Sequence, residues 1–180
     1  MAGIVQAKFR GRNDDGNETT ATWKAAENTN FSQAVDTNFR LRLQLNNTHP
    51  TDPLSAATRF QYNKNGAGWN DITTSSSVVK AVTSVNVADT TATTVQMGGL
   101  SFIAGEVTAD GLTASVTQNS LQTTEHELIC QIVSTDVVNN DSIQIRGIIS
   151  PSTAYDSYTN TPTITVTEAV TFIPKVIMVL

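Results

Sequence analysis

Apolar and polar residues alternate strictly in Phe39-Arg40-Leu41-Arg42-Leu43-Gln44-Leu45. Side chains two positions apart on a β-strand point to the same face of the sheet. One face of this segment therefore carries Phe and Leu side chains, and the opposite face carries Arg and Gln. This period of two predicts a strand whose apolar face lies on a hydrophobic core.

A hairpin is predicted a few residues later. Residues 58–63 alternate again, Asn65-Gly66 follows them, and residues 69–72 return. Asn-Gly is the pair best suited to the two positive φ angles of a tight type I′ turn. The remaining strand candidates are residues 78–82, 90–97, 100–105, 112–116, 125–133, 142–148 and 163–167.

These short strands, separated by turn residues at intervals of roughly 8 to 12 residues, are typical of a β-sandwich. No stretch of the chain has the periodicity of a long amphipathic helix. We therefore expect an all-β protein with a single β-sandwich, either Ig-like or jelly-roll, and the order of its strands stays open. In residues 125–133 we expect the side chains of Leu128, Cys130 and Ile132 to face the core.

The composition agrees with an ordered β protein. The chain of 180 residues contains 28 Thr, 15 Asn and 14 Ser, whereas charged residues make up 15%, against about 25% in an average globular domain. Disorder would need a high net charge, but the net charge is only -5. We expect no nucleic-acid partner, because 11 basic residues face 16 acidic ones. We expect no membrane insertion either, because no apolar run approaches about 18 residues.

The residues that carry chemistry are few. His49 and His126 are the only histidines, and Cys130 is the only cysteine, which excludes an internal disulfide. Glu125 and Glu127 flank His126, but neighbours on a strand point to opposite faces and cannot converge on a metal. We therefore expect no catalytic residues, no metal and no cofactor, and a protein that is not an enzyme. Cys130 is interpreted as a buried small hydrophobic residue.

Two weaker patterns suggest ligands. The oxygen-rich run from Asn13 to Glu18 resembles a calcium loop faintly, but it lacks a spaced bidentate Glu, and an acidic turn explains it better. Aromatic side chains could instead form a platform for a sugar, although a small core also needs such rings. The candidates for that platform are Tyr62, Trp69, Tyr155 and Tyr158.

The two ends of the chain differ in composition. We interpret residues 1–36 as an extended arm or a loosely packed hairpin, and residues 37–180 as the sandwich. An apolar strand ends the chain, and it must pair in its own sheet or be covered by a neighbouring subunit. We therefore expect self-association, through two sets of residues. They are Phe9, Arg10 and Arg12 in the arm, and Val176, Ile177, Met178, Val179 and Leu180 at the end.

Four segments together are similar to a known class of sequence: Phe39–Leu43, Phe60–Ile72, Glu125–Leu128 and Tyr155–Val166. Over roughly residues 35–170 the chain resembles Ig-like β-sandwich proteins among the virion structural proteins of tailed bacteriophages. These include capsid decoration proteins and tail-associated proteins. The resemblance rests on strand patterning and on the hairpin with Trp69.

This resemblance implies a non-enzymatic virion protein that is assembled in the host cytoplasm, most simply a decoration or cement protein bound to the major capsid protein. It also implies association with further copies of itself. A tail-tube or tail-terminator protein is one alternative. Another is a glycan-binding module of a phage fibre or of a secreted enzyme.

Overall fold

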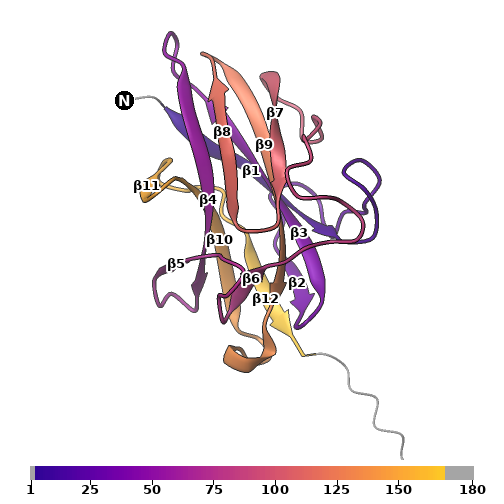
Figure 1. The fold of residues 1–180 in the computed structure, drawn as a ribbon. Coiled ribbons are helices and arrows are strands. Elements are labelled where there is room, and N and C mark those ends of the chain that lie inside the picture. The colour runs from indigo at the N-terminus through magenta and orange to yellow at the C-terminus, as the bar shows by residue number, and fades with distance from the viewer. Residues whose placement is uncertain (1–2, 169–180) are drawn as a thin grey trace, which may run out of the picture.

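Twelve strands form two sheets that pack face to face in this computed structural model, which describes residues 3–168 (Figure 1). In chain order the strands are β1 (Ile4–Asn13), β2 (Phe31–Ala34), β3 (Asn38–Asn47), β4 (Leu54–Lys64), β5 (Trp69–Asp71), β6 (Val79–Ala81), β7 (Ser101–Thr108), β8 (Leu112–Gln118), β9 (Gln122–Ile132), β10 (Ser142–Ile149), β11 (Thr153–Ala154) and β12 (Thr163–Thr167). A single turn of 3-10 helix, Ser134–Asp136, is the one helical segment in the described residues.

The first sheet has the order β1-β3-β9-β6, and β7 pairs in parallel with β9. The second sheet has the order β2-β12-β10-β4-β5, with β11 beside β10 and β8 beside β4. All pairs are antiparallel except β7 with β9 and β2 with β12. The predicted all-β sandwich is confirmed.

The alternation in β3 has the predicted effect. Phe39, Leu41 and Leu43 are fully buried, and they pack against Ile143 and Ile145 of the second sheet in one continuous core. Removing each such side chain from water contributes about 1.5–3 kcal/mol. The core side chains of β9 are Leu128, Cys130 and Ile132, as expected from the same period of two.

The predicted hairpin is β4 and β5. Asn65 has a φ of 50° and Gly66 a φ of 77°, which are the two left-handed conformations that a type I′ turn requires. Phe60 and Tyr62 point from β4 into the core, while Trp69 lies opposite Asn63 on the outer face.

Residues 1–36 are part of the sandwich wherever the structure describes them, rather than an arm that extends from it. β1 pairs with β3 along its length, and β2 joins the second sheet beside β12. The connection between them returns along the free edge of β1, where the backbone of residues 22–28 hydrogen-bonds with Phe9, Gly11 and Asn13. The backbone of Thr22, Lys24 and Asn28 is thus paired with a neighbouring strand, which the composition of the connection does not reveal.

The strand expected at residues 90–97 does not form. Its only strand-like feature is an isolated bridge between Ala92 and Glu106. Instead, the connection from β6 to β7 runs over the outer face of the first sheet, on the same side as the connection from β1 to β2 (Figure 1). These two connections form a third layer, which covers the polar face of β3.

Candidate functional site

The polar face of the first sheet holds three buried arginines. Arg12 on β1 and Arg40 and Arg42 on β3 have no exposed surface. All three surround the carboxylate of Glu127 on β9: Nη1 of Arg12 and Nη1 of Arg40 each lie 3.0 Å from its oxygens, and Nε of Arg42 lies 2.7 Å away. One carboxylate therefore serves as the centre of a buried arginine–glutamate cluster.

Three further carboxylates complete this cluster, two of them from the covering connection between β1 and β2. Asp14 lies 3.2 Å from Arg40, and Glu18 pairs with Arg42. Glu125 on β9 lies 2.9 Å from Nη1 of Arg42. Three cations thus face four anions, and buried charges require such pairing, because an unpaired ion in the interior is very costly.

The second covering connection is tied to the same cluster through its backbone. The carbonyl oxygen of Thr94 accepts a hydrogen bond from Nη1 of Arg42 over 2.9 Å. The backbone N–H of Met97 donates to Glu125 over 2.9 Å, and the N–H of Thr94 donates to Glu18 over the same distance. The cluster therefore holds both connections on the sheet.

Burial and charge pairing have opposite effects on the pKa values of Arg12, Arg42 and Glu18. Burial lowers the pKa of Arg12. Burial opposes the charge of Arg42, but Glu127, Glu18 and Glu125 outweigh it and raise the pKa. Burial alone would raise the pKa of Glu18, whereas hydrogen bonds from Arg42 and Thr94 lower it. The pairing of Arg42 with Glu18 thus stabilises the charged form of both side chains.

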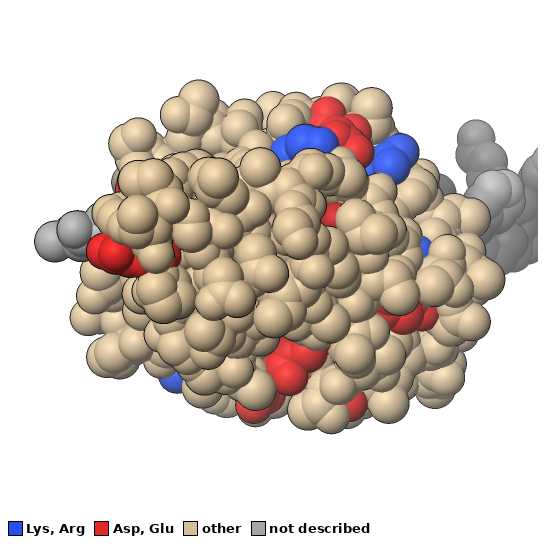
Figure 2. Space-filling view, turned by 90° about the horizontal axis from the view of Figure 1, so that it is seen from above, with Lys and Arg blue, Asp and Glu red and all other residues tan. Residues whose placement is uncertain are grey.

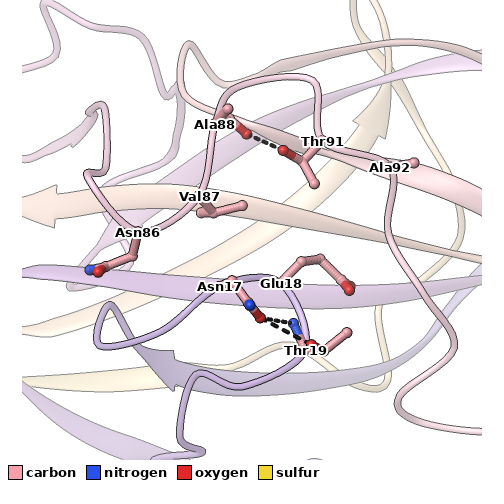
Figure 3. Close-up of a pocket in the computed structure, with 8 residues that line it drawn as sticks. All are labelled: Asn17, Glu18, Thr19, Asn86, Val87, Ala88, Thr91 and Ala92. Atoms are coloured by element: carbon pink, nitrogen blue, oxygen red, sulfur yellow. Dashed lines mark hydrogen bonds between the residues drawn. The ribbon is translucent and has the colours of Figure 1, made fainter.

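A pocket of about 400 Å³ lies between the two covering connections (Figure 3). Its polar lining comes from Asn17, Glu18, Thr19, Asn86 and Thr91, and its apolar lining from Val87, Ala88 and Ala92. The Glu18 carboxylate is already occupied by Arg42 and Thr94. The Oδ1 atom of Asn17 accepts hydrogen bonds from its own loop, including one from the N–H of Thr19. The pocket consequently offers little free hydrogen-bonding chemistry.

The candidate metal ligands and the candidate nucleophile do not form a common site in the described residues. Burial lowers the pKa of His126 to about 4, and its Nδ1 atom accepts a hydrogen bond from the N–H of Glu106. Cys130 is fully buried, and burial raises the pKa of its thiol. In the run from Asn13 to Glu18, the carboxylates bind Arg40, Thr22 and Arg42. Within residues 3–168 no group of three or more His, Cys, Asp or Glu residues is placed to hold a metal ion.

Of the four aromatic residues considered for a sugar platform, the structure places two, Trp69 and Tyr158, against one partly exposed side chain, Arg146. Tyr62 and Tyr155 are buried, and the hydroxyl of Tyr155 lies 2.7 Å from that of Thr58. Trp69 and Tyr158 are only half-buried, and both rings contact the guanidinium of Arg146, at 4.1 and 4.9 Å. We call these three residues the aromatic–arginine stack. Sequence analysis missed Arg146, because nothing in its strand distinguishes it from other polar positions.

The residues expected at an interface through the arm lie elsewhere. Phe9 is part of the core and Arg12 belongs to the buried cluster. The guanidinium of Arg10 lies 4.3 Å from the ring of Trp23, over the edge of β1. The apolar end, residues 176–180, lies outside the described residues.

The described fold defines the chain as a β-sandwich with two connections clamped over one sheet. No helix in residues 3–168 has the length and apolar character needed to cross a membrane. No protein-family model, curated protein or solved structure matches the chain.

Proposed function

We propose that this protein is a non-enzymatic structural component of a bacteriophage virion, of the capsid decoration type. In this proposal it assembles in the host cytoplasm, binds the major capsid protein from the outside and associates with further copies of itself. The starting point is the resemblance of residues 35–170 to virion sandwich proteins.

The observation that carries the proposal is the placement of charge. Three of the 11 basic residues and their carboxylate partners are committed to the interior. Figure 2 shows that charged side chains are few and scattered on the end of the molecule that it presents. A surface of hydroxyl and amide groups binds through shape and hydrogen bonds, as a component of a tightly packed shell requires, rather than through a broad electrostatic field.

The buried cluster supports the same role in a second way. The chain has one cysteine and so cannot form an internal disulfide. As a shell component it has to keep its shape without one. Broken buried ion pairs are strongly penalised, so the arrangement of sheet and covering connections is specified sharply. The contact with the shell would use residues 176–180, since Phe9 and Arg12 are occupied inside the sandwich.

Co-sedimentation with capsid shells tests the proposal. Shells are assembled from the major capsid protein encoded in the same genome and incubated with the full chain. We expect the chain to pellet with the shells and to appear in cryo-electron micrographs as projections in regular positions. We expect deletion of residues 176–180 to abolish pelleting while the circular dichroism of the sandwich is retained. A matched control replaces the exposed Val138, which is 65% exposed, by Ser.

Two results would contradict the proposal. One is a full chain that stays in the supernatant at every shell concentration. The other is a truncated chain that occupies shells as fully as the complete chain does.

A further inference from the structure

The aromatic–arginine stack lies on the outer face of the second sheet. β10 contributes Arg146, β5 contributes Trp69, and the segment after β11 contributes Tyr158. On this face Arg146 is opposite Gln61 of β4, and Gln61 is opposite Asp71 of β5. Three separate parts of the chain therefore meet at one surface site.

The guanidinium of Arg146 is held in a fixed orientation. Its Nε and Nη2 atoms donate to Oε1 of Gln61 over 3.1 and 2.9 Å. The Nε2 atom of Gln61 donates in turn to Asp71 over 2.8 Å. Among the residues that the structure describes, none accepts a hydrogen bond from Nη1 of Arg146, so this planar donor has hydrogens left for a ligand.

The position of Tyr158 is also fixed, and its backbone is strained. Its φ is 56°, a left-handed conformation that is unfavourable for a bulky side chain. Its hydroxyl donates to the carbonyl oxygen of Gly147 over 2.7 Å and accepts from the N–H of Tyr155 over 3.0 Å. Strained residues that the surroundings hold in place are concentrated at binding sites. The ring of Tyr158 is therefore arranged before any ligand arrives.

The chemistry of this site suits a sugar. Half-exposed rings of Trp and Tyr offer an apolar surface on which the C–H face of a pyranose can stack, and a few fixed polar groups then set its orientation. Arg146 supplies donors to sugar oxygens, and Gln61 and Asp71 hold it in place. Nucleic acid fits poorly, because the net charge of the chain is -5.

We propose that the aromatic–arginine stack is a carbohydrate-binding site. The sugar ring packs on the parts of Trp69 and Tyr158 that the guanidinium of Arg146 does not cover, and one of its oxygens accepts a hydrogen bond from Nη1 of Arg146. The site does not depend on the proposed function in a virion, because it uses different residues and a different ligand.

The experiment uses the full chain and an array of immobilised oligosaccharides, half of them neutral and half containing uronate. Binders from the array are then titrated in solution while tryptophan fluorescence is recorded. The chain has two tryptophans, so Trp23→Phe makes Trp69 the only reporter. We expect at least one oligosaccharide to bind and to change the emission of Trp69. Comparing the two halves of the array shows whether Arg146 binds a hydroxyl or a carboxylate.

Two variants test the site, and a third is the matched control. We expect Trp69→Ala to weaken binding tenfold or more, measured on the immobilised oligosaccharides because this variant lacks the fluorescent reporter. We expect Arg146→Lys to weaken it several-fold, because lysine keeps the charge but lacks the planar donor. The control is Trp23, whose ring also contacts arginine guanidinium groups, those of Arg10 and Arg12 at 4.3 and 4.4 Å. Because Trp23 lies outside the aromatic–arginine stack, we expect Trp23→Phe to bind as the unmodified chain does.

The proposal is overturned if no oligosaccharide binds, or if binding is equally strong in Trp69→Ala and in the control. Thermal melting confirms the fold of each variant. If Trp69→Ala loses its melting transition, Arg146→Lys decides the question alone, and unchanged affinity in that variant would count against the site. Capsid binding in the earlier experiment is unaffected by either result.

Discussion

Arg42 and Glu127 lie opposite each other on β3 and β9, and Nε of Arg42 donates to Oε2 of Glu127 over 2.7 Å with no exposed surface on either side chain. The same carboxylate also binds Arg12 and Arg40. An interior charge centre of this kind joins the sheet to the two connections above it, so the stability of the fold should depend strongly on Glu127.

Replacing this carboxylate by an amide tests that dependence. We expect Glu127→Gln to lower the free energy of unfolding by about 3–5 kcal/mol, because it leaves buried arginines without their common partner. Chemical denaturation followed by circular dichroism measures the change. The control is Glu27→Gln, which removes a partly exposed pair with Lys8 at 3.0 Å and should cost no more than about 1 kcal/mol. Equal losses in both variants would show that the cluster contributes no more to the free energy of unfolding than an exposed ion pair does.

His126 should make stability depend on pH. Burial lowers its pKa from 6.5 to about 4 in the folded chain, so the unfolded chain binds the proton more readily. The stability that comes from the neutral imidazole is complete above pH 6.5 and is lost as the pH falls toward 4, by about 3 kcal/mol in total.

Urea unfolding between pH 7 and pH 4 measures this loss. We expect His126→Gln to flatten the slope in that range, because the buried imidazole is then absent. A slope that persists unchanged without His126 would assign the effect to other groups.

Gly111 occupies the turn between β7 and β8 in close contact with Ile72. Its φ is 86°, and a Cβ atom there would lie 2.0 Å from the carbonyl oxygen of Ile72. Gly68 has a φ of 114°, with open space around the same position. We expect Gly111→Ala to lower the melting temperature clearly more than Gly68→Ala. Both substitutions place alanine at an unfavourable positive φ, but only the Cβ atom at position 111 would clash with Ile72. Similar melting temperatures would show that the turn moves aside.

Cys130 should be unreactive in the folded protein. It lies between the sheets with no exposed surface, and burial raises the pKa of its thiol, which removes the reactive thiolate. We expect a thiol reagent such as DTNB to release no colour from the native chain and one equivalent per chain in denaturant. Rapid reaction under native conditions would contradict the buried position.

The core could be predicted because its information is local. The alternation in Phe39–Leu45 assigns side chains to two faces, and Asn65-Gly66 determines a turn through its own backbone preferences. Alternation cannot show whether a distant connection covers the second face, so the burial of Arg40 and Arg42 was not foreseen. A usable signal was present. Arg-x-Arg in one strand and Glu-x-Glu at 125–127 in another carry opposite charges at positions two residues apart, which can lie opposite each other when the two strands pair.

The aromatic–arginine stack could be predicted only in part for the same reason. Sequence reasoning identified Trp69 and Tyr158 as candidates by residue type, but their proximity depends on the pairing of β10 with both β4 and β11. Tyr62 and Tyr155 have the same chemistry, but Tyr62 faces the core from β4, and Tyr155, just after β11, is buried with Ile4 and Leu45.

The connection that runs along β1 also limits how copies of the protein can join. Its backbone occupies donors and acceptors that a strand edge would otherwise present to a foreign chain. Further along the same edge, Asp156 accepts from the N–H of Gln6, and Asn160 donates to the carbonyl oxygen of Ala7. The first sheet is therefore sealed against polymerisation through β1, and an added subunit has to attach by side-chain contacts or at another edge.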